Sequence, residues 1–108
     1  MLTYGEYLLT VAGEECAEIQ QELAKCIRFG CSNHDPSPGA GPKSHAEKVI
    51  EEYYQLNAVM EMLYQKEVLS RPSKEEVQRI KNEKKAKVKK YFRQYENRTT
   101  YRPRNHKN

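Results

Sequence analysis

Helical periodicity, interrupted twice, is the feature that most constrains the fold of this chain. Apolar residues recur at every third or fourth position in three segments, which we predict to be helices over about residues 3–28, 44–69 and 73–95. The Pro/Gly/Ser-rich stretch "GCSNHDPSPGAGP" (30–42) separates the first two, and "SRPS" separates the last two. Ser44 with Glu47, and Ser73 with Glu76, have capping-box spacing at the starts of the second and third helices. No segment alternates as a strand does, so we expect an all-α bundle of three main helices.

The length of 108 residues is enough for one small domain, which we expect over residues 1–97, followed by a basic, loose tail at 98–108. The apolar stripes are too narrow for a monomer to cover its own core, which predicts a homodimer or homotetramer. No apolar run approaches the roughly 20 residues of a membrane span. The three cysteines lack the spacing of a disulfide scaffold, so we expect reduced thiols and a cytoplasmic protein.

Charge is distributed unevenly along the chain. Residues 1–70 carry 5 Lys/Arg and 11 Asp/Glu, a net charge of −6, whereas residues 71–108 carry 14 and 4, a net charge of +10. This asymmetry suggests that the first part attracts cations and the second attracts phosphates.

The apolar stripes of the first two helices contain carboxylates. In the first helix, steps of three or four pass through Glu15 and Glu22, and Glu18 neighbours Glu15. In the second, the stripe passes through Glu52, and Gln55 follows three residues later. Inward carboxylates are stable only when protonated or paired, and hard oxygen ligands from two helices suit Mg²⁺ or Mn²⁺. Alternatively, these glutamates lie at the edge of the stripe, where they reach water or pair with lysines of the third helix. The stripes consist of Leu8, Ala12, Ile19 and Cys26, with Leu23 beside them, and of Val49, Leu56, Val59, Met60 and Leu63.

The third helix is basic, with Lys84 in its apolar stripe and Lys87 and Arg93 close by. It is either a solvated face or a phosphate-binding edge. Aromatic residues interleave the basic ones in "KVKKYFRQYENRTTYRPR", a pattern that could stack bases, so a nucleic-acid-binding module over residues 81–104 is a further alternative.

Together, "GEECAEIQQELAKCIRFG" and "EEYYQLNAVMEML" resemble the two halves of the MazG-like all-α nucleoside triphosphate pyrophosphohydrolases, especially small phage-type members. Glu15 and Glu18 match the first acidic pair of that family, and Glu52 matches the glutamate of the second. The resemblance covers residues 5 to 98 and implies Mg²⁺- or Mn²⁺-dependent cleavage of a nucleotide in the host cytoplasm. It implies metal ligation by Glu15, Glu18, Glu52 and Gln55, catalysis by the three glutamates, and substrate binding by Arg28, Lys84, Lys87, Tyr91 and Arg93.

One position departs from that family. Its second acidic pair ends in aspartate, where this chain has Gln55, and an amide oxygen carries no formal charge. A second hypothesis is therefore a weak or inactive relative that sequesters a nucleotide or a nucleotide second messenger.

The cysteines, histidines and paired tyrosines have simple structural interpretations. A zinc site of Cys26, Cys31, His34 and His45 has no common ligand spacing and is disfavoured. We expect Cys16 to be a small core residue, and Tyr53 and Tyr54 to be aromatics of the core or of a dimer interface.

Overall fold

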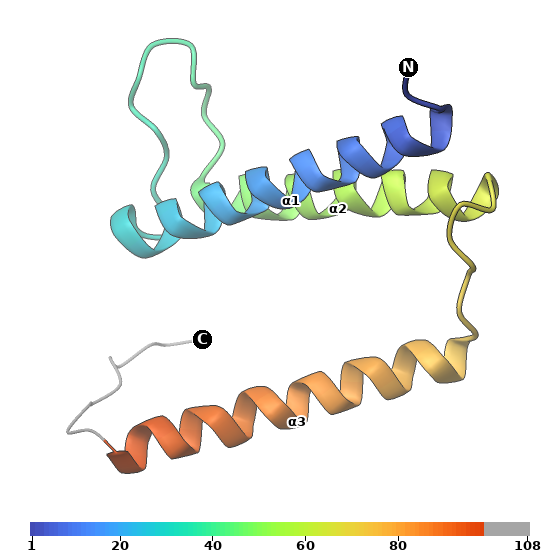
Figure 1. Cartoon of the computed structure of the whole chain (residues 1–108). Helices are drawn as coiled ribbons and strands as arrows, with labels where there is room; N and C mark the ends of the chain where they lie inside the picture. Colours follow the sequence, from blue (N-terminus) through green and yellow to red (C-terminus); the bar gives the residue numbers. More distant parts are fainter. Residues whose placement is uncertain (99–108) are drawn as a thin grey trace. The chain divides into compact units, whose positions relative to one another are not determined.

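The computed structural model describes residues 1–98, with side chains for residues 1–96. Over this range it contains three helices and no strand, which confirms the all-α prediction: α1 (Tyr4–Phe29), α2 (His45–Gln65) and α3 (Lys74–Arg98) (Figure 1). The chain forms two compact units, residues 1–70 and the segment from residue 71 onward. The domain boundaries at 97 and 98 stay predictions, and residues 99–108 of the predicted tail lie outside the described residues. In the described part, no helix has the length and apolar content needed to cross a membrane.

Helices α1 and α2 form an antiparallel hairpin (Figure 1). Its core contains Leu8 and Leu63, which are 2% and 0% exposed. Gly5 allows the start of α1 to approach the segment after α2, because a Cβ there would lie 3.0 Å from Val68 Cγ2. The predicted stripes therefore face one another, and their half-buried members include Ala12, Ile19, Cys26, Val49, Leu56, Val59 and Met60.

Capping boxes start both helices of the hairpin. Thr3 Oγ1 accepts from the Glu6 backbone N–H at 3.1 Å, and the Glu6 carboxylate accepts in return from the Thr3 N–H. Ser44 and Glu47 make the same reciprocal pair at the start of α2, as the sequence predicts. Each box satisfies two backbone donors that a helix N-terminus otherwise leaves without partners.

Helix α2 ends at Gln65, earlier than the predicted end near residue 69. Glu67 adopts a left-handed backbone conformation with φ of 57°. The Val68 N–H then donates to the Leu63 carbonyl at 3.0 Å, and the Glu67 N–H donates to the Tyr64 carbonyl at 3.0 Å. These two bonds form a Schellman motif, with glutamate at the position that usually takes glycine.

The loop between α1 and α2 is fixed at both ends. Gly30, with φ of 94°, turns the chain out of α1. The first N–H groups of α2 are bound by this loop, since His45 N donates to the Asn33 carbonyl at 2.8 Å and Ala46 N donates to the Cys31 carbonyl at 3.0 Å. The loop therefore lies against the start of α2 and occupies its N-terminal donors.

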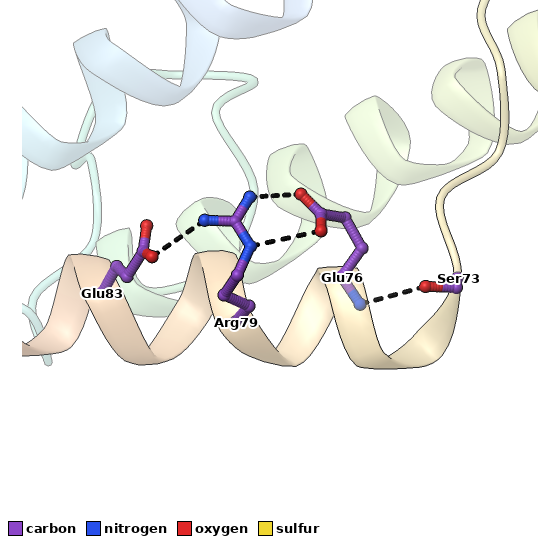
Figure 2. Close-up of polar contacts among 4 residues, drawn as sticks. All are labelled: Ser73, Glu76, Arg79 and Glu83. Atoms are coloured by element: carbon purple, nitrogen blue, oxygen red, sulfur yellow. Dashed lines mark hydrogen bonds and ion pairs between the residues drawn. The ribbon is translucent and has the colours of Figure 1, made fainter.

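Local contacts mark the start of α3. The Glu76 backbone N–H donates to Ser73 Oγ at 3.1 Å, as predicted (Figure 2). The Glu76 carboxylate, however, pairs with Arg79 rather than completing a capping box, and Arg79 Nη1 also donates to Glu83 at 2.8 Å. Apart from half-buried Glu76 and Val77, the described side chains of α3 are exposed.

Candidate metal centre

Three carboxylates converge on the inner side of the hairpin. Glu15 and Glu18 come from α1 and Glu52 from α2, and one oxygen atom of each lies within 4.8 Å of the others. Across residues 1–96, no other group of three His, Cys, Asp or Glu side chains comes together in this way. The structure therefore joins the two acidic motifs that the sequence predicts to form one site.

The helical register explains this convergence. Glu15 follows Leu8 by seven residues, which is about two turns, so it lies on the side of α1 that packs against α2. Glu52 lies on the corresponding side of α2, eleven residues before the buried Leu63. Glu15 and Glu52 are half-buried, as predicted, whereas Glu18 is exposed at the edge of the interface.

The pKa of Glu52 is strongly raised by its surroundings. Burial, followed by hydrogen bonding and charge repulsion from Glu18 and then Glu15, raises the pKa of Glu52 to about 7. Near neutral pH the cluster thus holds a proton that isolated carboxylates would have released. A cation placed among the same oxygens would favour the ionised form of Glu52 and so oppose this rise in its pKa.

Gln55 lies directly beside the carboxylates. One terminal atom of its amide is 3.2 Å from Glu15 Oε2 and 2.8 Å from Glu52 Oε2. With nitrogen in this position, Gln55 donates a hydrogen bond to each carboxylate, while the opposite orientation turns a fourth oxygen toward them. The amide can therefore either satisfy the carboxylates or extend their oxygen set.

A second polar pair lies two turns along the same interface. The His45 and Glu22 side chains are 3% and 12% exposed, and His45 Nδ1 is 3.8 Å from Glu22 Oε2. Both atoms are buried without a hydrogen-bond partner, while Glu22 Oε1 accepts from Lys25 Nζ at 3.2 Å. The sequence suggests a role for His45 only in the disfavoured zinc set, so this pair was not predicted. His45 precedes Glu52 by seven residues and therefore lies on the same face of α2, and this spacing could have predicted that His45 faces α1.

The predicted substrate-binding residues do not all belong to this cluster. Arg28 lies ten residues beyond Glu18, about 15 Å along α1, and its guanidinium carbon is 5.0 Å from the centre of the Phe29 ring.

The remaining four residues lie on α3, in the second unit. Lys84, Lys87 and Tyr91 share one face of that helix, whereas Arg93, nine residues from Lys84, lies about two and a half turns away and so on the opposite face. Arg93 lines a hollow of about 370 Å³ that is otherwise formed by Ala86, Lys89, Lys90 and Gln94. One ligand lying along a single face of α3 would not contact all four predicted residues.

The structure also tests the predictions for Cys16, for the paired tyrosines and for the zinc set. Cys16 is exposed, so its assignment to the core is wrong: eight residues after Leu8, it lies beside the buried side of α1 and not on it. Tyr53 and Tyr54 pack edge to face with ring centres 5.1 Å apart, but are 48% and 63% exposed, so they are outside the core of the hairpin. The residues of the disfavoured zinc set, which are Cys26, Cys31, His34 and His45, form no three-ligand group in the described chain.

Comparisons with protein-family models, curated proteins and solved structures find no match to this chain.

Proposed function

We propose that the protein is a MazG-like nucleoside triphosphate pyrophosphohydrolase, which cleaves a nucleotide to its monophosphate and pyrophosphate. The observation that supports this most directly is the convergence of Glu15, Glu18 and Glu52 from two facing helices. The i, i+3 pair on α1 matches the first acidic motif of that family, and Glu52 on α2 matches the glutamate of the second, whose aspartate is replaced by Gln55. In this assignment the hairpin is the catalytic unit.

The donor set fits Mg²⁺ or Mn²⁺. All the candidate ligands are hard oxygens, and Gln55 can add an amide oxygen to the three carboxylates. The pKa of Glu52 is raised by burial and by the neighbouring carboxylates of Glu18 and Glu15, so a bound cation would offset charge that the protein itself does not neutralise. When bound there, the ion would supply positive charge against the phosphate oxygens and lower the pKa of the attacking water.

In this proposal, different residues bind the metal ion and the substrate. Glu15, Glu18 and Glu52 would hold the ion, and Gln55 would add its amide oxygen as a further ligand. Lys84 and Lys87 would bind the triphosphate, with Arg28 and Tyr91 as further substrate contacts, whereas Arg93, on the opposite face of α3, would not contact the same ligand. In the reaction, water oxygen bonds to the α-phosphorus and the water gives up a proton to a carboxylate of the cluster or to solvent. The bond from the α-phosphorus to the bridging oxygen breaks, and pyrophosphate leaves with that electron pair.

We also propose that the protein works as a homodimer or homotetramer. The hairpin buries few large apolar side chains completely and exposes others, including Ile27 at 84%, Ile50 at 58% and Tyr54 at 63%. A second copy would cover such side chains and complete a larger bundle. Light scattering should give a multiple of 12.7 kDa at micromolar concentration, and a mass equal to 12.7 kDa would refute the assembly.

A second candidate function is sequestration of a nucleotide without cleavage. The specific observation in its favour is Gln55, whose amide nitrogen can satisfy Glu15 and Glu52 when no cation is present. Catalysis needs charge held in a fixed geometry, whereas phosphate binding can also use the lysines of α3. A Gln55→Asp variant should then raise pyrophosphate release and leave nucleotide affinity within a few-fold.

A third candidate is binding of single-stranded nucleic acid by α3. Its basic side chains and its aromatic residues Tyr91, Phe92 and Tyr95 are exposed. Such binding depends on phosphate contacts, so its affinity should fall steeply with salt.

One experiment separates the three. The protein, a Glu52→Gln variant and a matched Glu61→Gln control, exposed on the same helix, are incubated with Mn²⁺ and a panel of nucleotides. Pyrophosphate release that is lost only in Glu52→Gln supports the hydrolase. Nucleotide binding without release in the parent, with release gained in Gln55→Asp, supports sequestration. Salt-sensitive binding of an oligonucleotide without nucleotide binding supports the third function and contradicts the other two.

A further inference from the structure

A cavity of about 550 Å³ opens where the end of α1, the loop after it and the start of α2 meet. This volume is in the range of small-molecule sites. The cavity belongs to the same compact unit as the acidic cluster and lies about two helical turns from it along the interface, since His45 precedes Glu52 by seven residues. Its lining consists of Lys25, Phe29, Asn33, His34, Asp35, Pro36 and His45.

One part of the lining suits a flat ring. Phe29 is 51% exposed although it is a large aromatic residue, and its ring already carries the planar guanidinium of Arg28 at 5.0 Å. The Phe29 and His45 rings are 5.9 Å apart at an interplanar angle of 31°. Exposed aromatic rings of this kind stack planar heterocycles such as nucleobases.

His45 gives the cavity a buried polar wall. Its side chain is 97% buried, and its Nδ1 atom faces Glu22 Oε2 at 3.8 Å without a hydrogen-bond partner. A small movement that closes this distance would let Nδ1–H donate to Glu22 and fix the tautomer of the ring. Nε2 is then the polar ring atom of His45 that a bound molecule can engage.

Asp35 supplies a fixed hydrogen-bond acceptor. Its Oδ1 atom accepts from the Ser37 backbone N–H at 2.9 Å, which holds the loop in a tight turn. The Ser37 backbone N–H, and then the Ser37 side chain, lower the pKa of Asp35 below its ordinary value. The carboxylate therefore stays ionised at neutral pH, and as an acceptor without protons it favours ligand groups that donate.

We propose that this cavity binds the base of the nucleotide, and that Asp35 selects bases with an exocyclic amine, which are cytosine, adenine and guanine, over uracil or thymine. The exocyclic amine donates to Asp35, whereas uracil and thymine carry only carbonyl oxygens as exocyclic polar groups, and these would face a negative charge. The inference rests on the proposed function only for the identity of the ligand as a nucleotide, because the phosphates would then lie at the acidic cluster. It adds a specificity for the base that the acidic motifs do not contain.

The test uses nucleosides, which lack phosphates, in the presence of EDTA and with the full chain. Binding of cytidine, adenosine, guanosine, uridine and thymidine is followed by changes in the backbone amide NMR signals of residues 29–35. We expect the three nucleosides with an exocyclic amine to bind about ten-fold more tightly than uridine or thymidine, the effect of one hydrogen bond to a charged group. Equal affinities for all five nucleosides, or no binding of any, would overturn the inference.

Two variants locate the effect. D35N keeps an oxygen for the Ser37 N–H and adds an amide donor, so the preference should disappear or reverse toward uridine. Phe29→Leu keeps apolar volume but removes the stacking face, so affinity for every nucleoside should fall about ten-fold. Gln20→Ala, at an exposed polar position of α1 that is not part of the cavity lining, is the control and should change neither. A D35N protein with the preference of the parent would show that Asp35 does not select the base.

These results are independent of catalysis. Selective nucleoside binding in a protein that neither binds Mn²⁺ nor releases pyrophosphate would remove the hydrolase proposal and leave the base site standing. Pyrophosphate release from all nucleotides at equal rates, without selective nucleoside binding, would support the hydrolase and refute the base site.

Discussion

The two units of the protein use glutamate in opposite ways. In the α1–α2 hairpin, burial and neighbouring carboxylates raise the pKa of Glu52 to about 7, so the cluster resists ionisation. On α3, a side-chain hydrogen bond from Arg79 lowers the pKa of Glu76 below its ordinary value. The hairpin therefore draws its stability from packing and tolerates unfavourable charge at its site. Helix α3 has little packing of its own and relies on pairs between successive turns.

Truncating the core of the hairpin should separate the two units most clearly. Leu63→Ala removes a fully buried side chain, and such changes cost about 2–5 kcal/mol of unfolding free energy. The matched change on α3, Val88→Ala, alters a 55% exposed side chain and should cost less than about 0.5 kcal/mol. Urea denaturation followed by circular dichroism measures both.

Equal losses for Leu63→Ala and Val88→Ala would contradict the comparison. They would mean that α3 is as deeply packed in solution as the core of the hairpin, for example in an assembled bundle. Measuring both variants over a range of protein concentrations separates that case, because assembly makes stability depend on concentration.

The second prediction concerns pH and Glu52. Since the pKa of Glu52 is raised from 4.5 to about 7 in the folded state, the folded protein keeps a proton that the unfolded chain releases. The contribution of Glu52 to the free energy of unfolding should therefore be fully present below about pH 4.5, and it should be lost as the pH rises toward about 7. The expected loss is about 1–3 kcal/mol, a range that allows for partial solvent screening.

Glu52→Gln removes the titrating group and should abolish this fall, while Glu61→Gln should keep it. Unfolding free energies at about pH 5 and about pH 8, in the presence of EDTA, give the comparison. If the three proteins show the same pH dependence, Glu52 titrates as an ordinary surface carboxyl. Added Mn²⁺ should selectively recover stability at the higher pH in the parent, because a cation replaces the missing proton.

Much of this arrangement could be predicted from the sequence because it depends on local rules. Apolar spacing located the three helices, and Ser44 with Glu47 located the start of α2. The same spacing placed Glu15 and Glu52 on facing sides of the hairpin, where the structure brings them together. These features follow from the helical period and from cap chemistry, which few residues determine.

The remaining features depend on contacts between distant segments. The burial of His45 and the cavity beside it arise only when the loop folds against α2, and no periodic pattern reports that contact. Helix α2 ends early because Glu67 takes a conformation that glutamate rarely adopts. Cys16 was assigned to the core by its residue type, although its helical position faces solvent.

The end of α2 provides a third test, with a smaller effect. Glu67 holds φ of 57°, a conformation that disfavours residues with a Cβ, so Glu67→Gly should stabilise the hairpin by about 0.5–1 kcal/mol. Glu67→Ala is the control, since alanine keeps the Cβ and should give no such gain. Thermal denaturation of both variants measures the difference, and an equal gain from alanine would show that the charge of Glu67, not its backbone, was unfavourable.

The smallest expected effect is in α3, where Arg79 pairs with Glu76 one turn before it and with Glu83 one turn after it (Figure 2). Arg79→Ala removes both pairs, so helical content near the start of α3 should fall slightly, as measured by backbone NMR chemical shifts in the full chain. Alanine is itself a strong helix former, so the matched control Lys81→Ala should leave helicity unchanged or raise it. High salt should lower the helicity of the parent toward that of Arg79→Ala, because both pairs are exposed. Arg79→Lys should lie between the two, since lysine keeps the charge but not the two-pronged geometry. An Arg79→Ala variant as helical as Lys81→Ala would mean that α3 is held by its packing, and the contrast between the two units would disappear.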